Sequence, residues 1–215
     1  MAKPSDFSAT LMAQLAIALA KEGVEPVDID VLCARKNVLR TIPQLARGEA
    51  EVVTKRILAH LGVVKLDAQP KFVVSDNFKL DTNNFAIVKI GYIPVDFFIL
   101  FNNLVEDEAP KAELKCHRLE ESSRADRLFN ELGNSTEVKL SQIFALMRKQ
   151  SRGPQSKGVA LLTNGHMNIF KVRNTKGELC VVSVRWNNGY NCWDVYAHSL
   201  NDPLVWAANS RVFSQ

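Results

Sequence analysis

Hydrophobic side chains recur every three or four residues over the first 66 residues, and this spacing predicts helices. One run, residues 45–62, has the length of a helix-turn-helix motif, and Lys55 and Arg56 lie where its DNA-reading helix would begin. The glycine expected at the turn, Gly48, comes too early for that motif. An ordinary amphipathic helix explains the same pattern, so both interpretations stay open.

Near residue 71 the pattern changes to short segments with alternating or β-branched side chains. These segments predict strands at 71–74, 86–92 and 112–119. Residues 95–101 are apolar throughout, and at this length periodicity does not distinguish a buried strand from a short helix.

Helical spacing returns at 122–132 and at 142–150, and Ser141 is the expected N-cap of the second helix. Its inward face is expected to pack on the C-terminal sheet through three residues: Ile143, Leu146 and Met147.

The last sixty or so residues alternate short strands with turn signals, which is typical of an antiparallel meander. Asn164-Gly165 predicts a tight hairpin between its two flanking segments. The expected elements are strands at 159–163, 167–173, 178–186 and 192–198, a helical turn at 203–208 and an edge strand at 211–213.

Together these elements predict an α+β fold with a helical N-terminal region, a mixed middle region and a C-terminal antiparallel meander packed on a helix. The expected boundaries are 1–66, 67–150 and 151–215, and all three parts are also compatible with one compact domain. Whether the strands form one sheet or two is left open by the sequence.

The chain carries a formal net charge of +4 that is unevenly distributed: residues 67–138 are acidic overall, whereas residues 139–215 are strongly basic. A basic sheet with exposed rings would suit single-stranded nucleic acid. The alternative is a half-buried sheet whose rings face the core and whose charges face water. The residues concerned are Lys171, Arg173, Lys176, Arg185, Trp186 and Trp193.

The four cysteines, Cys33, Cys116, Cys180 and Cys192, are widely spaced and form no C-x-x-C pair. This spacing indicates reduced, mostly buried thiols and neither a disulfide framework nor a zinc site. No metal or other cofactor is therefore expected.

An apolar run at residues 9–20 is similar in pattern to a signal peptide, but it also makes a good amphipathic helix. No stretch has the roughly eighteen uncharged apolar residues of a membrane span. We therefore expect a cytoplasmic protein that does not enter a membrane.

No motif in the sequence is specific enough to name a reaction. A cysteine-dependent hydrolase would need a thiolate, a histidine base and an orienting group. The candidates are Cys33 and His166, with Asn164, Asp194 or Asn168 as the orienting group. The favoured expectation is a non-enzymatic protein that binds another macromolecule through the basic sheet or the N-terminal helices. A protein partner is favoured over nucleic acid because the net charge is modest and the acidic middle region would repel phosphate.

Overall fold

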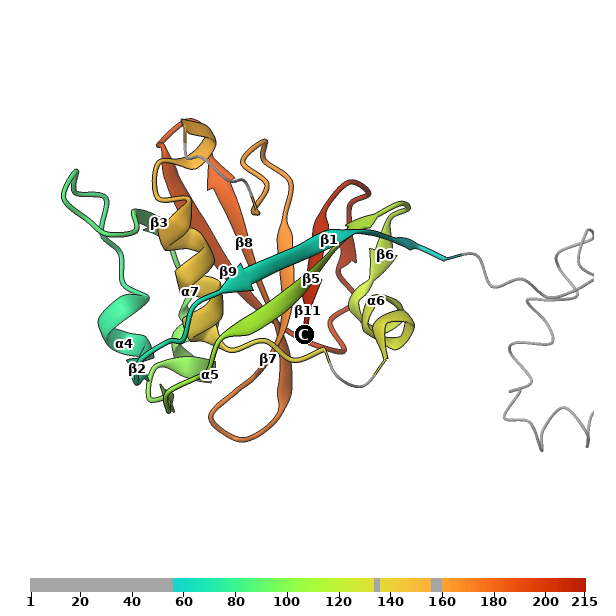
Figure 1. The fold of residues 1–215 in the computed structure, drawn as a ribbon, viewed down its shortest axis with the longest axis horizontal. Coiled ribbons are helices and arrows are strands. Elements are labelled where there is room, and N and C mark those ends of the chain that lie inside the picture. Colours follow the sequence, from blue (N-terminus) through green and yellow to red (C-terminus); the bar gives the residue numbers. More distant parts are fainter. Residues whose placement is uncertain (1–55, 134–135, 156–159) are drawn as a thin grey trace, which may run out of the picture. The chain divides into compact units, whose positions relative to one another are not determined.

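A seven-stranded mixed sheet organises the part of the chain that the computed structural model describes, residues 56–133, 136–155 and 160–215 (Figure 1). Residues 56–215 form one compact unit, and residues 1–55, with most of the predicted helical region, lie outside the described residues. In spatial order the strands are β1 (Leu58–Leu66), β5 (Ala112–Leu119), β11 (Arg211–Ser214), β7 (Asn168–Arg173), β8 (Leu179–Asn187), β9 (Cys192–Ser199) and β3 (Ile90–Tyr92).

Two short ladders and four helices surround this sheet in the described residues. The ladders are β2 (Phe72–Val73) with β4 (Val105–Glu106) and β6 (Ser123–Arg124) with β10 (Val205–Trp206). The helices are α4 (Val74–Asn77), α5 (Val95–Phe101), α6 (Ala125–Leu132) and α7 (Leu140–Lys149), followed by a 3-10 turn at Gly153–Gln155. The α+β expectation is thus confirmed for this part of the chain.

β1 occupies a segment for which helical spacing predicted a helix, so that prediction is wrong from Leu58 onward. The strand pairs antiparallel with β5 along its whole length, with a bulge between His60 and Gly62. Leu58 and Leu66 are buried, whereas Leu61 and Val63 are exposed. Cross-strand pairing with β5 therefore outweighs the weak helical period of this short segment.

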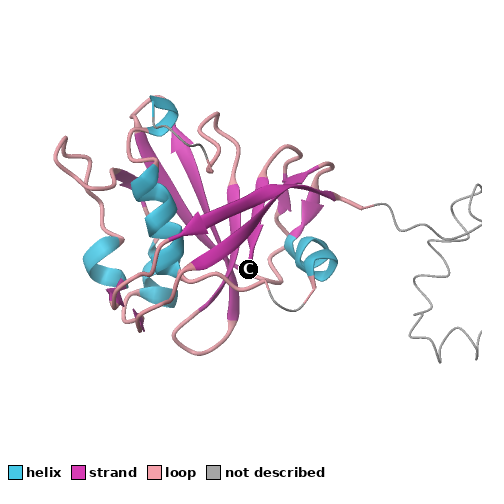
Figure 2. Ribbon diagram, in the orientation of Figure 1, coloured by secondary structure: helices cyan, strands magenta, loops and turns pink. Residues whose placement is uncertain are grey.

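One face of the sheet is covered by α5 and α7, which bury the larger hydrophobic core. Ile143, Leu146 and Met147 lie in the same buried cluster as Val182 and Val184 of β8, as the sequence predicted. In Figure 2, α7 runs along β8 and β9.

The N-terminus of α7 is capped differently from the sequence prediction. Ser141 lies inside the helix, and its hydroxyl has no hydrogen-bond partner. The carboxylate of Glu106 instead accepts the amide N–H groups of Leu140 (2.8 Å) and Ser141 (2.9 Å). A charged acceptor 34 residues away in sequence thus satisfies the free amides of the first turn.

The opposite face is only partly covered. Helix α6 and the β6–β10 ladder pack there against β1, β5, β7 and β11, in a second core that includes Leu128, Phe129 and Trp206. Val181 of β8 also belongs to this second core, whereas Arg185, Asn187 and Tyr196 on the same face are partly exposed. The half of this face formed by β8, β9 and β3 is called the open face below.

The C-terminal meander is confirmed for β7, β8 and β9, which pair antiparallel in sequence order. Residues 160–163 form no strand, so Asn164-Gly165 is not a hairpin turn; the side chain of Asn168 instead bonds both backbone groups of Leu162. The predicted helical turn at 203–208 contains the strand β10. β11 is not an edge strand, because it lies between β5 and β7 and is parallel to β7.

One seven-stranded sheet contains strands from both the predicted middle region, 67–150, and the predicted C-terminal region, 151–215. Residues 112–119 form the expected strand, residues 95–101 form a helix, and the strands near 71–74 and 86–92 are shorter than predicted. No helix in the described residues is long and apolar enough to cross a membrane.

Candidate interaction site on the open face of the sheet

The open face contains a hollow of about 520 Å³ between β3, β8 and β9. Strand alternation places Arg185, Asp194 and Tyr196 on this face, because the neighbouring Val184, Trp186, Trp193 and Val195 point into the core beneath α7. Register then puts Arg185 directly opposite Asp194.

Asp194 is the centre of a hydrogen-bond network at the base of this hollow, and it is 4% exposed. Its Oδ2 accepts from Arg185 Nη2 at 2.9 Å and from Asn187 Nδ2 at 3.2 Å. The same Nη2 of Arg185 donates to the Tyr196 hydroxyl at 2.9 Å. The hydrogen bond to Asp194 raises the pKa of Arg185, so the guanidinium is charged throughout the physiological range. A buried carboxylate paired in this way holds Arg185 rigidly in place.

Aromatic rings form the walls of the hollow. The rings of Tyr92 and Tyr196 are 5.4 Å apart, and Tyr190, on the turn between β8 and β9, is 80% exposed. The floor is open because residue 91 is glycine: a Cβ there would collide with the Cys192 sulfur. The exposed side chains of Tyr92 and Tyr190 therefore lie beside the fixed Arg185, at the rim of a shallow hollow.

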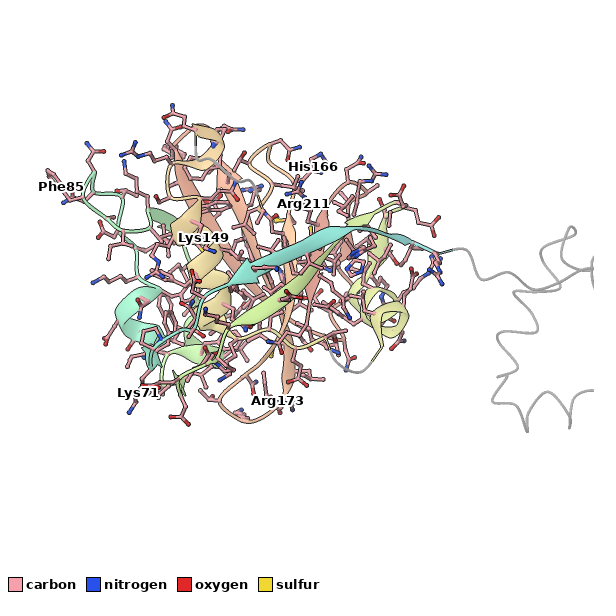
Figure 3. All side chains as sticks on the ribbon, viewed as in Figure 1. Lys71, Phe85, Lys149, His166, Arg173 and Arg211 are labelled. Carbon is pink, nitrogen blue, oxygen red and sulfur yellow. The ribbon has the colours of Figure 1, made fainter. Side chains whose placement is uncertain are left out.

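Exposed apolar side chains continue from this hollow onto the loop that precedes β3. The turn at Asp81 is closed by its carboxylate, which accepts the Asn83 amide at 2.9 Å. Beyond it, Phe85 is 93% exposed and Ile87 is 67% exposed, and Figure 3 shows Phe85 at the outer tip of the loop. Apolar side chains exposed to this degree on neighbouring positions are typical of interaction surfaces.

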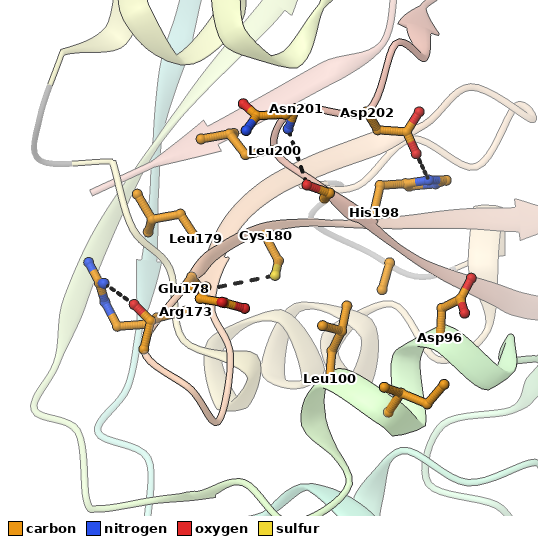
Figure 4. A pocket seen from close by; sticks show the side chains of 14 residues that line it. Asp96, Leu100, Arg173, Glu178, Leu179, Cys180, His198, Leu200, Asn201 and Asp202 are labelled. Atoms are coloured by element: carbon orange, nitrogen blue, oxygen red, sulfur yellow. Dashed lines mark hydrogen bonds and ion pairs between the residues drawn. The ribbon is translucent and has the colours of Figure 1, made fainter.

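A second hollow, of about 810 Å³, lies between α5 and the ends of β8 and β9 (Figure 4). Cys180 and His198 both line it, but register places them on opposite faces of the sheet, because Cys180 pairs with Ser199 and His198 with Val181. His198 Nδ1 instead faces Asp202 Oδ2 at 3.4 Å. Burial raises the pKa of the Cys180 thiol, which makes it a poor nucleophile. The two residues do not form a catalytic pair.

The predicted basic-aromatic surface is not assembled as the nucleic-acid interpretation requires. Trp186 (3% exposed) and Trp193 (0% exposed) pack edge to face inside the core, so neither ring can stack on a base. Lys171 is buried, with its Nζ 5.5 Å from the centre of the Phe129 ring. The alternation of a half-buried sheet explains the sequence pattern.

Two more of the basic residues predicted to bind a partner are ion-paired with carboxylates. Arg173 pairs with Glu137, and Arg185 pairs with Asp194. Arg56 and Lys176 are exposed, and Lys55 lies outside the described residues.

The residues proposed for a hydrolase are not brought together in the described part of the chain. Cys33 lies outside it. Asn164 Oδ1 accepts the backbone amide of His166 at 3.2 Å and so stabilises the turn without orienting the imidazole. Within the described residues there is also no cluster of three or more histidine, cysteine, aspartate or glutamate side chains that would hold a metal ion.

Sequence reasoning selected Arg185, considered Asp194 only as an orienting group for a hydrolase histidine, and did not select Tyr196 or Tyr92. The turn signal at Asn187–Gly189 places Arg185 and Asp194 near each other across a hairpin, and that pairing was available from the sequence. Tyr92 could not be assigned, because β3 joins β9 as a parallel neighbour from about one hundred residues away.

Comparisons of the chain with family models, with curated proteins and with solved structures found no match.

Proposed function

We propose that this chain is a non-enzymatic binding protein whose partner is another protein, and that the partner docks on the open face at Tyr92, Tyr190 and Arg185. Tyrosine and arginine are the residue types that most often dominate the binding energy of protein interfaces. Here the arginine is held by a buried carboxylate, Tyr92 lies at the end of β3, and Tyr190 is exposed on the turn between β8 and β9. Little side-chain entropy is then lost at Arg185 when a partner binds.

The observation that carries this proposal is the group of exposed apolar side chains beside the hollow: Tyr92 and Tyr190 in its lining, and Phe85 and Ile87 on the loop that precedes β3. Val95 and Ile99 are also exposed, but they belong to α5, and Ile99 lines the second hollow. Elsewhere in the described residues the exposed large hydrophobics are more scattered along the sequence. Covering such a surface with a partner is favourable.

Charge and chemistry support a protein partner over the alternatives. Nucleic acid would need accessible rings beside unpaired cations, whereas the tryptophans are buried and Arg173 forms an ion pair with Glu137. A thiol hydrolase would need an activated thiolate. Burial raises the pKa of the three described thiols, Cys180, Cys192 and Cys116, the last to about 11, whereas the candidate Cys33 lies outside the described residues.

The test is affinity capture from the native host, with and without nuclease, using the wild-type chain, the Tyr92→Ala/Tyr190→Ala double variant and a matched control. The control is Val63→Ala, which removes an exposed apolar side chain from β1 at the far edge of the sheet. We expect the wild type and the control to retain the same protein after nuclease treatment and the double variant to retain at least about tenfold less. The proposal would be refuted if nuclease treatment abolished the capture, or if the double variant captured the same protein as the wild type does.

A further inference from the structure

Lys89, beside the open-face hollow, forms no ion pair within the described residues, and Arg185 pairs with the buried Asp194. Lys89 lies in the segment that leads into β3 and donates to the neutral Asn84 Oδ1 at 2.7 Å. Its charge acts on Cys192 in the floor of the hollow, where it lowers the thiol pKa against the larger effect of burial. The carboxylate lining the hollow, Asp194, is buried and already accepts from Arg185 and Asn187.

Lys89 also lines a neighbouring hollow of about 440 Å³ with Asn84, Asn191 and Trp186. Strand pairing joins the linings of the two hollows, because the carbonyl of Lys89 accepts the amide of Trp193, the residue between Cys192 and Asp194 of the open-face hollow. Together, the described residues that line them supply positive charge, amide groups and exposed tyrosine rings.

Arg185 has hydrogen-bonding capacity left over. In the described structure, all hydrogen bonds of the Arg185 side chain are donated by Nη2. Its Nε and Nη1 donate to no protein atom, and 36% of the side chain is exposed. A carboxylate from a partner would therefore find a charged donor already positioned.

We propose that the partner presents an acidic segment containing an aromatic residue, with carboxylates at Lys89 and Arg185 and the aromatic ring against Tyr92 and Tyr190. The inference rests on the proposed function and specifies the chemistry of the partner. Complementary charge would set the rate and specificity of docking, and the buried ring would supply most of its strength. The second hollow, at α5, is lined by three carboxylates, Asp96, Glu178 and Asp202, and by Arg173, which is ion-paired with Glu137. We therefore expect an acidic segment to bind at the open face and not at the hollow beside α5.

Fluorescence anisotropy of the full chain with three labelled peptides tests the proposal. The first alternates glutamate with tryptophan, the second replaces tryptophan by alanine, and the third replaces glutamate by lysine. Only the first should bind saturably, and its affinity should fall as salt rises. Absence of saturable binding by the first peptide up to about 1 mM, or equal binding of the first and third, overturns the proposal.

Two variants outside the buried core locate the peptide: Lys89→Glu, at a half-buried position, and Tyr190→Ala, at an exposed one. Each should weaken binding of the first peptide by about tenfold or more. The matched control Lys176→Glu reverses an exposed charge on the β7–β8 turn and should change the affinity less than twofold. Equal loss in all three variants would indicate nonspecific attraction of a polyanion and would overturn the assignment.

The failure of this inference can be told from the failure of the proposed function. A captured protein that depends on Tyr92 and Tyr190, together with no binding of the acidic peptide, would refute only the acidic chemistry. Capture that is indifferent to both tyrosines would refute the proposed function itself. Self-association that the Tyr190→Ala variant abolishes would assign the surface to a second copy of this chain and overturn the acidic-partner proposal.

Discussion

Gly153 is a residue whose conformation and surroundings both exclude a side chain. Its φ is +57°, and a Cβ would run into the indole of Trp186. We expect Gly153→Ala to lower the free energy of unfolding by about 2–4 kcal/mol, from backbone strain and overpacking combined. Urea denaturation measures this.

Gly177→Ala is the matched control, because φ is +79° there but no atom lies within 4 Å of the added Cβ. It should cost only the backbone strain, about 1–2 kcal/mol. Equal losses of unfolding free energy in the two variants would show that Trp186 moves away from the added methyl group without an energetic cost.

His117 is a residue whose burial makes stability depend on pH. Desolvation lowers its pKa below the ordinary value of 6.5, and the nearby His60 lowers it further. The imidazoles lie 5.1 Å apart, and His117 Nδ1 has no hydrogen-bond partner in the described structure. The unfolded chain therefore binds a proton at His117 more readily than the folded chain does.

The contribution of His117 to stability is accordingly complete above pH 6.5 and is lost as the pH falls toward the lowered pKa of the folded state. We expect this part of the pH dependence to disappear in His117→Leu and to persist in His166→Gln, when unfolding is followed between pH 7.5 and 5. An unchanged pH profile in His117→Leu would contradict the assignment.

Helix α7 is the element that joins the middle of the chain to the C-terminal strands. Leu146 is 1% exposed and belongs to the core shared with β8 and β9. Leu146→Ala should lower the free energy of unfolding by about 2–5 kcal/mol, because the core would not close fully over the cavity. Arg148→Ala, on the exposed side of the same helix, should change it by less than about 0.5 kcal/mol. A similar melting temperature for Leu146→Ala and wild type would refute this packing.

Two carboxylates connect elements that the sequence leaves apart. Glu106 caps α7, and Glu131 of α6 accepts the amides of Ile57 (2.9 Å) and Leu58 (3.1 Å) at the start of β1. Each satisfies backbone donors that would otherwise need water. Local capping rules select Ser141 because such rules consider only neighbours in sequence.

Across the whole molecule, the described cysteines are reduced and buried: Cys116, Cys180 and Cys192. Native protein should therefore react slowly with a thiol reagent at these positions, whereas unfolded protein should label all four cysteines of the chain without reductant. Mass spectrometry of the labelled protein provides the count. A mass that retains an intact disulfide would contradict the reduced state.

Alternation and turn chemistry were sufficient to predict the local β elements. Strand β5 was predicted with its observed ends, and β7, β8 and β9 within one or two residues, because these hydrophobic segments are separated by glycine- or asparagine-containing turns. The inward face of α7 followed from its helical period in the same way.

Pairing between segments distant in sequence could be read only from the assembled fold. β11 is short and C-terminal, which suggests an edge, yet its fully buried Val212 and Phe213 stabilise it between β5 and β7. β1 is a strand because β5 supplies its backbone partners.

The candidate site likewise combines contacts that are local in sequence with contacts between distant segments. Hairpin register between β8 and β9 places Arg185 opposite Asp194, and this much is local. Tyr92 and Lys89 join them only because β3 docks in parallel beside β9, through contacts between residues about one hundred positions apart. Residue types and turn signals thus determine which side chains alternate on a strand, whereas the burial of hydrophobic faces between distant segments determines which strands become neighbours.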